Sequence, residues 1–339
     1  MSLDTDNRTD TDRGQRPLHA GNSRGTWLES VLVPSSLRIL GAAGVLWAVA
    51  TLAFFTMRLV PGDPVDALLG GPGNNATEAV RHATRELNGL NEPLLVQYSA
   101  YLSRLVTGNL GDSYQLREPV AQVLGEQLGG TLVLAILALV SAWILALGLA
   151  LWAAHGGKTA TLVGNLLEII SAAVPHFWLG SLLILVFSVG LQWLPATSGA
   201  PGFEGLLLPV LTLAIPLAGF LGQVLRESML SAMKSPFAIS ARARGESEAS
   251  VSLRHALRHA ALGGIGLSGW AMGSLISGAV VVETVFSRPG IGRTLLQSVL
   301  VRDVPVVLGV VVLVAVVYIF VTLLSDLAER LADPRLRDR

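Results

Sequence analysis

The sequence has no cysteine and few charged residues. Without cysteine it cannot form disulfide bonds or thiolate metal sites. Asp, Glu, Lys and Arg make up 14% of the residues and hydrophobic residues 51%, whereas soluble domains are about 25% charged. This scarcity of charge predicts a membrane protein. The net charge of +0 therefore conceals an uneven distribution of charge along the chain.

The N-terminal region lacks the apolar core and the small-residue cleavage site of a secretory signal peptide. It is polar and rich in arginine instead. We expect residues 1–36 to form a disordered cytoplasmic tail and residues 331–339 to form a second, short cytoplasmic tail.

Six stretches lack charged residues for long enough to cross a hydrocarbon core, which takes about 20 helical residues. They are uniformly apolar rather than alternating, which favours helices over membrane strands. The predicted fold is an all-α integral membrane protein with six transmembrane helices. Residues 37–60 hold the first span, 61–130 an extracytoplasmic insert, and 131–330 the remaining spans. The six stretches are 39–57, 127–154, 169–191, 205–225, 260–282 and 304–325.

Lys and Arg are concentrated in alternate loops. If the N-terminus is cytoplasmic, sixteen of the 24 lie in cytoplasmic segments. The positive-inside rule therefore places both termini and the loop after the fourth span in the cytoplasm. In the insert on the other side, apolar residues recur at helical spacing from Leu94 to Leu105. This helix is expected to serve either as a packed lid or as a docking surface for an external protein.

The loop between the fourth and fifth spans, residues 235–261, has the pattern helix, break, helix. Ser235 suits an N-cap, Pro236 the first helical position, and Gly245 the left-handed residue that ends a helix. A second helix follows, with an apolar stripe from Leu253 to Ala260. The loop therefore offers a folded, basic surface to a soluble partner.

Small residues recur four apart in the fifth span, at Gly269, Gly273 and Ser277. This spacing lets helices approach closely and predicts an interior helix. The hairpin after the span turns at Pro289 and Gly290. We expect a short amphipathic helix at the outer surface to lead from this turn into the last span.

Several motifs match enzyme or metal-site patterns but lack the necessary context. Residues 157–159, GKT, follow a membrane helix rather than a strand, which argues against a phosphate-binding loop. Residues 266–269, GLSG, resemble the nucleophile motif of intramembrane serine proteases, but the last histidine, His259, precedes this serine and is not placed as its base. His255 and His259 have a two-ligand spacing, yet neighbouring arginines favour a solvated basic face. Lipid contact by these arginines is a secondary expectation, and nucleic acid is not an expected partner.

Residues 239–245 read ISARARG and are followed by His255-Ala-Leu257. This stretch resembles the cytoplasmic signature loop of ABC importer permeases of the dipeptide/oligopeptide/nickel class. The resemblance covers about 37–337. Two departures are Ile239, where the general signature has Glu, and Gly263, where a proline is expected; the second leaves open how sharply the loop helix bends into the fifth span. The class shows similar motifs in the same order: VPGDP at 60–64, GNLGDS at 108–113, PHFWLG at 175–180, LPVLTL at 208–213, VETVF at 282–286, PGIG at 289–292 and ADPRL at 332–336.

The resemblance implies a permease subunit in a bacterial cell membrane that imports di- or oligopeptides. Its implied partners are a second homologous permease, two cytoplasmic ATPase subunits and an extracytoplasmic solute-binding protein. The chain itself would be non-catalytic and bind no cofactor or metal, because ATP and Mg belong to the ATPase subunits. A nickel or metal-chelate permease is the alternative within transport, and an intramembrane serine protease is the alternative from another class.

The loop is expected to dock in a groove of an ATPase and to move the fourth and fifth spans as a rigid lever. Phe237, Ile239, Ala241 and Ala243 would supply its shape, and Arg242 and Arg244 its electrostatic register. The full set of expected coupling residues is Phe237, Ile239, Ser240, Ala241, Arg242, Ala243, Arg244, Gly245, Glu246, His255 and Leu257.

A substrate path is expected between the two permeases, along the third to sixth spans. Its candidate lining groups could equally be hydrogen-bond partners between helices. Glu283, at the outer end of the fifth span, is a candidate gate or an ion-pair partner of Arg288 or Arg293. The candidate lining groups are Ser171, Thr212, Gln223, Ser268, Ser274 and Ser277.

Overall fold

The computed structural model describes residues 25–59, 62–71, 75–198 and 202–332. Most of the two expected tails, 1–24 and 333–339, lies outside the described residues. Residues 25–36, which we expected in the N-terminal tail, are helical in α1 (Gly25–Leu59). The chain divides into two units, Met1–Gly44 and Val45–Arg339, and the description below concerns the second.

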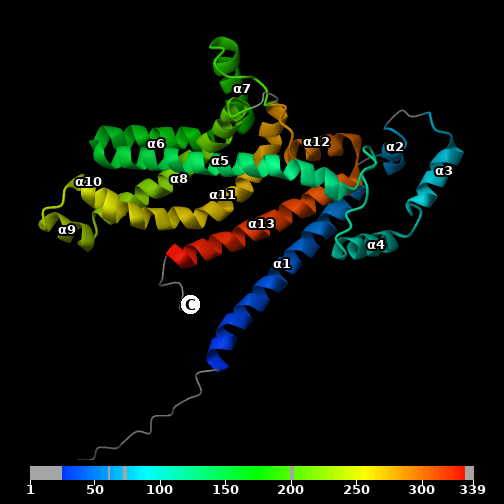
Figure 1. Cartoon of the computed structure of the whole chain (residues 1–339), viewed down its shortest axis with the longest axis horizontal. Helices are drawn as coiled ribbons and strands as arrows, with labels where there is room; N and C mark the ends of the chain where they lie inside the picture. The colour runs from blue at the N-terminus through cyan, green and yellow to red at the C-terminus, as the bar shows by residue number, and fades with distance from the viewer. Residues whose placement is uncertain (1–24, 60–61, 72–74, 199–201, 333–339) are drawn as a thin grey trace, which may run out of the picture. The chain divides into compact units, whose positions relative to one another are not determined.

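Within the described residues the secondary structure is helical, apart from one isolated bridge between Asp112 and Pro119. Figure 1 shows the order of the helices. The insert contains α4, which confirms the helix expected between Leu94 and Leu105, and also two helices that we did not expect, α2 and α3. After α1 the elements are α2 (Pro64–Leu68), α3 (Glu78–Leu87), α4 (Leu94–Val106), α5 (Val120–His155), α6 (Gly157–Ala173), α7 (His176–Leu183), the π-helix η1 (Ile184–Gly190), α8 (Glu204–Met233), α9 (Pro236–Ala243), α10 (Glu248–Val251), the π-helix η2 (Ser252–Ala256), α11 (Leu257–Val285), α12 (Ile291–Val301) and α13 (Val304–Ala332).

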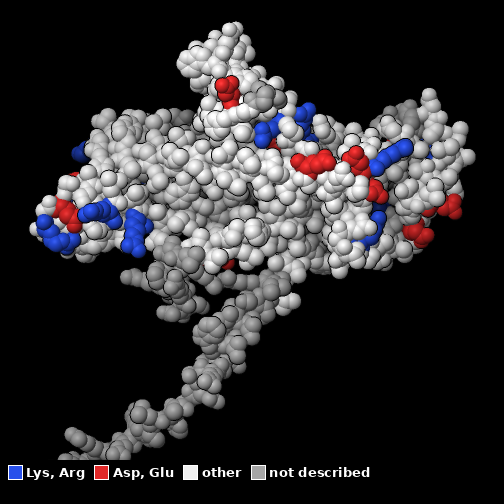
Figure 2. Space-filling model, in the orientation of Figure 1, with Lys and Arg blue, Asp and Glu red and all other residues white. Residues whose placement is uncertain are grey.

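Five helical segments in the described part of the chain are long and apolar enough to cross a membrane, and a bent helix pair raises the number to six. The all-α membrane fold is therefore confirmed. Figure 2 shows charged side chains at the left end of the visible face and from the middle of the view to the right, with an almost uncharged stretch between these two groups. The five segments are Leu40–Leu59, Val120–His155, Glu204–Met233, Glu248–Val285 and Val304–Ala328.

The third span differs from the straight helix expected over residues 169–191. Instead, the chain bends by 104° between the segments Gly157–Ala173 and His176–Gly190. In Figure 1, α7 turns away from α6. Pro175 explains the break, because it has no amide hydrogen and disfavours the helical conformation in the preceding residue. Val174 accordingly has a ψ of 125°.

The second span also begins earlier than expected. α5 starts at Val120, inside the residues that we assigned wholly to the insert, and runs for 36 residues. Such a helix is about 54 Å long, whereas a hydrocarbon core is about 30 Å thick. The first turns of α5 therefore belong to the insert and connect it directly to the bundle.

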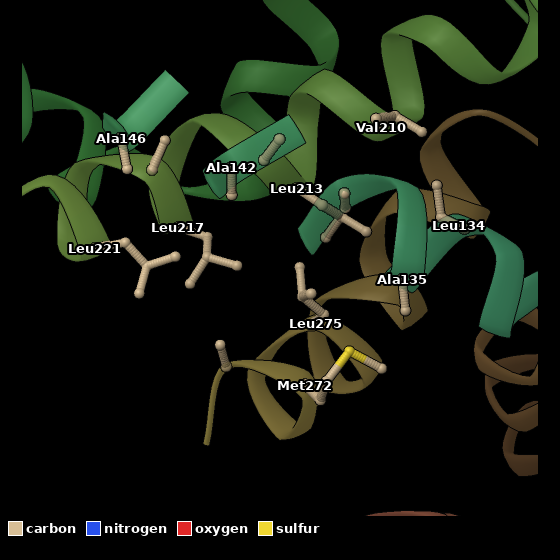
Figure 3. Close-up of a cluster of buried hydrophobic side chains, with 14 of the residues drawn as sticks. Leu134, Ala135, Ala142, Ala146, Val210, Leu213, Leu217, Leu221, Met272 and Leu275 are labelled. Carbon is tan, nitrogen blue, oxygen red and sulfur yellow. The ribbon is translucent and has the colours of Figure 1, made fainter. Parts of the chain in front are cut away.

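The core lies where α5, α8 and α11 meet. The buried face of α5 presents alanines four residues apart, Ala138, Ala142, Ala146 and Ala150, each 0% exposed. Leucines of α8 and Met272 and Leu275 of α11 belong to the same cluster (Figure 3). Small side chains on one helix let the larger side chains of the next approach closely, which compensates for the weak hydrophobic drive between helices in lipid.

Glycines bring α11 against α13. A Cβ atom on Gly273 would lie 2.7 Å from the Tyr318 ring, and one on Gly269 would lie 2.9 Å from Ser325. These distances leave no room for a side chain, so the tight packing predicted from the small-residue spacing is confirmed. Ser277, the third residue of that series, is exposed.

Candidate functional site

The loop after α8 folds as predicted at its break. Pro236 occupies the first helical turn of α9, and Gly245 has a φ of 86°. The Gly245 amide donates to Arg242 O at 2.9 Å and the Glu246 amide to Ala241 O at 3.2 Å. This pair of bonds is the Schellman arrangement that ends a helix at a left-handed glycine. Ser235 occupies the N-cap position, but its hydroxyl donates to Ala232 O at 2.5 Å and does not cap the helix.

The second loop helix does not bend into the fifth span. α10, η2 and α11 form one uninterrupted helical segment, Glu248–Val285, of 38 residues. Gly263, where related loops were expected to carry a proline, retains the amide hydrogen that a continuous helix needs. The second part of the loop and the fifth span are therefore one helix, and not two helices joined by a kink.

A small apolar core holds the loop together. Ala238, Ala241 and Val251 are each 0% exposed and pack with Met233. We expected Ala241 to shape the outer contact surface, but its side chain points into this core. Leu257 likewise packs against the main bundle core.

Arg242 makes its hydrogen bonds within the loop, and its side chain is 33% exposed. Its Nε and Nη2 atoms donate to Glu248 at 2.6 and 3.0 Å, and its Nη1 donates to Met233 O at 2.8 Å. The hydrogen bond from Arg242 lowers the pKa of the Glu248 carboxyl. Arg242 thus joins α8, α9 and α10, and its expected role in the register of a partner stays a prediction.

Glu246 and the two histidines complete the internal contacts of the loop. Glu246 lies 3.2 Å from His255 Nε2 and accepts from Arg244 at 3.3 Å. Partial burial raises the pKa of Glu246, but hydrogen bonds from His255, Ser250 and Arg244 outweigh it and the net shift is downward. His259 stacks on the Phe237 ring, with centroids 4.7 Å apart. These contacts give both histidines structural partners.

The exposed part of the loop carries both apolar and basic side chains. The side chains of Phe237, Ile239 and Leu253 are 37%, 58% and 53% exposed. Ser240, Ala243 and Arg244 are exposed beside them. Apolar residues at the tip of a polar loop are unfavourable in water and typical of a contact surface. We call these six residues the loop surface.

At the opposite end of α11, the Glu283 carboxylate is 0% exposed. It accepts hydrogen bonds from Thr131 Oγ1 at 2.5 Å, from the Gly292 amide at 2.8 Å and from the Arg293 amide at 3.1 Å. We expected the guanidinium of Arg288 or Arg293 as its ion-pair partner; in the described residues its hydrogen-bond donors are instead a hydroxyl and two backbone amides. Glu283 therefore caps the start of α12, and its role as a gate stays a prediction.

A second buried carboxylate was missed by the sequence analysis. Asp303 is 2% exposed and lies between α12 and α13. It accepts from Ser113 Oγ at 2.5 Å, from the Tyr114 amide at 3.1 Å and from the Gln115 amide at 3.2 Å. Ser113 closes the GNLGDS motif, so this motif turns toward the start of the last span.

The candidate path residues do not form one group. Thr212 is 0% exposed and donates to Leu208 O at 2.7 Å, and Ser268 accepts from Trp143 Nε1 at 3.0 Å. These two hydroxyls serve helix packing. Ser274 and Ser277 are exposed on α11, and Ser171 and Gln223 are partly buried.

A buried ion pair between α6 and α8 was also missed. Arg226 Nε donates to Glu168 Oε2 at 2.9 Å, and its Nη2 donates to Asn165 Oδ1 at 3.0 Å. The Glu168 side chain is 0% exposed and that of Arg226 10%. Both residues lie one position outside charge-free stretches, which is the signal that could have drawn attention to them.

An apolar helical bundle whose central helix continues into a folded polar loop has the architecture of a membrane transport subunit. Two family models match the chain. The binding-protein-dependent transport system inner membrane component matches residues 146–338, and the N-terminal component of the same system matches residues 36–135. The chain belongs to this family and is a multi-pass membrane permease.

Relatives from bacteria support the same assignment. A putative peptide transport system permease protein of Brucella abortus is 35% identical over 308 residues, which cover 88% of this chain and 97% of that protein. The glutathione transport system permease protein GsiC of Salmonella choleraesuis is 35% identical over 303 residues, with the same coverage of 88% and 97%. Among solved structures, the inward-facing MetNI methionine ABC transporter superposes with a TM-score of 0.54 at 15% identity, over 62% of this chain and 97% of that one. This likeness shows the fold alone.

Proposed function

We propose that this chain is one of two homologous permease subunits of an ATP-driven importer of di- and oligopeptides. It works with two ATPase subunits in the cytoplasm and a solute-binding protein outside. It is non-catalytic, and both of its termini are cytoplasmic. The observation that carries the proposal is the folded loop, with exposed apolar residues at its tip and no break between it and α11.

The geometry supports a lever mechanism. An ATPase that grips the loop surface would displace α9 and α10 together, because Arg242 and the small apolar core join them. The displacement would pass directly into α11, since the helix runs from Glu248 to Val285. α11 packs against α5, α8 and α13, so its movement would reorient the bundle and switch access to the path.

Uptake by the reconstituted complex tests the function. With both permeases, the ATPases and the binding protein in proteoliposomes, we expect ATP-dependent accumulation of labelled di- and oligopeptides. The peptide names of the relatives support this cargo. Accumulation of chelated nickel without peptide would favour the metal-chelate alternative, and the absence of any ATP-dependent uptake would contradict the importer assignment.

The proposed orientation can be tested because the chain has no cysteine. Leu87→Cys places a thiol on α3, at a position that is 87% exposed, and Lys158→Cys places one at the exposed start of α6. A membrane-impermeant maleimide is expected to label Leu87→Cys in intact spheroplasts and Lys158→Cys only after permeabilisation. The reverse pattern would refute cytoplasmic termini.

A further inference from the structure

A buried carboxylate lies at each end of α12. At its start, Glu283 accepts from the Gly292 and Arg293 amides. At its end, Arg302 is left-handed with a φ of 60°, and the Asp303 amide donates to Ser298 O at 2.8 Å. The bonds to the Glu283 carboxylate are charge-assisted and therefore stronger than neutral ones. α12 therefore has a fixed attachment at each end.

Each carboxylate also reaches a further part of the molecule. Glu283 accepts from Thr131 of α5, whose hydroxyl oxygen in turn accepts from the Ile291 amide at 2.9 Å. Asp303 accepts from Ser113 and from the two amides that follow it. These bonds join residues that are 152 and 190 positions apart in the sequence. One bond lies at each end of the 11-residue helix α12.

The start of α12 packs closely against α11. A Cβ atom on Gly292 would lie 2.6 Å from the Val280 backbone nitrogen, and one on Gly290 would overlap the Glu283 carboxylate. The two helices therefore touch backbone to backbone at this point. Close-packed contacts switch between discrete arrangements and do not deform continuously, so displacement of α11 must carry the start of α12 with it.

We propose that Glu283 and Asp303 are positioning residues for transport, because they make α12 a relay between the lever and the insert. Movement of the loop passes along α11 to Glu283, along α12 to Asp303, and from Asp303 to the turn at residues 113–115. The insert would then change position when the ATPases close, and a binding protein docked on the outer side would affect the ATPases by the same route. This inference rests on the proposed function.

The test uses the complete transporter in nanodiscs, with Asp303→Asn and Thr131→Val as variants. Asparagine directs an NH₂ group at one of the donors that Asp303 now accepts from, and valine removes the Thr131 hydroxyl while keeping its shape. Basal ATP hydrolysis is expected to persist, whereas hydrolysis stimulated by the binding protein is expected to fall at least about tenfold, equivalent to about 1.4 kcal/mol. Thr131→Ser, which keeps the hydroxyl, and Glu118→Gln, which changes an exposed carboxylate of the same segment, are the matched controls.

A distance measurement separates a relay from a merely structural role. Spin labels on Leu116→Cys, beside the 113–115 turn and 58% exposed, and on Ile144→Cys of α5, 66% exposed, report the insert against the bundle. Trapping the ATP-bound state is expected to shift this distance in the parent and not in Asp303→Asn.

Preserved stimulation and an unchanged distance shift in both Asp303→Asn and Thr131→Val would overturn the relay. Equal loss in Thr131→Val and Thr131→Ser would overturn it too, because the defect would then not depend on the hydroxyl. A parent complex that the binding protein fails to stimulate would refute the proposed function instead.

Discussion

Ala241→Asp is expected to abolish ATP-dependent uptake and to release the ATPase subunits from the purified complex. The Ala241 side chain is 0% exposed and lies in the closed cluster of Ala238, Val251 and Met233. An unpaired carboxylate in such a cluster costs several kcal/mol. Because about 1.4 kcal/mol is a factor of ten, the population of correctly folded loop should fall at least about a hundredfold.

Ile239→Asp is the matched comparison for Ala241→Asp. Its side chain is 58% exposed on the same helix, so the loop should keep its fold and only its affinity for the ATPase should fall. Limited proteolysis at the Gly245 turn distinguishes an unfolded loop from a folded loop that binds weakly. If Ala241→Asp left both uptake and ATPase retention normal, the loop would have no part in energy coupling.

Arg226→Met is expected to destabilise the isolated permease strongly. The change leaves the fully buried Glu168 carboxylate without its cation, and breaking a buried ion pair in this way costs about 3–5 kcal/mol. A loss of that size lowers the thermal midpoint by roughly 4–7 °C in a chain of 339 residues. Within the described residues, the second carboxylate oxygen, Oε1, has no hydrogen-bond partner, so little else could compensate.

The paired variant Glu168→Leu/Arg226→Met tests the explanation. Because it removes both charges, the thermal midpoint is expected to recover much of the loss caused by Arg226→Met alone. A double-mutant cycle gives the coupling energy between the two residues. Additive effects of the two single changes would mean that the ion pair does not hold α6 against α8.

The parts of the fold that follow from local pattern could be read from the sequence. Charge-free length identified the apolar segments, and Gly245 and Pro236 located the break in the loop, because a left-handed residue and a fixed φ are properties of single residues. The break at Pro175 was predictable on the same grounds. It was missed because length and hydropathy alone defined residues 169–191 as one span.

The buried polar contacts could not be read in the same way. Glu283 and Asp303 bind mainly hydroxyls and backbone amides, which leave no pattern in the side-chain sequence, and Thr131 and Ser113 lie far from them along the chain. Ala241 was expected to shape the outer contact surface because the facing of a helix of eight residues cannot be fixed without its neighbours. Its burial in the small apolar core of the loop, and not its residue type, places it there.

The turn at Gly245 also limits which amino acids can replace this glycine. Space is open around this residue, since a Cβ atom would meet nothing within 4 Å, and only the backbone angle resists change. Every missense change of a glycine codon introduces a Cβ atom, which in this conformation costs about 1–2 kcal/mol, least for asparagine or aspartate. Tolerated substitutions at this position should therefore favour those two amino acids and avoid β-branched ones.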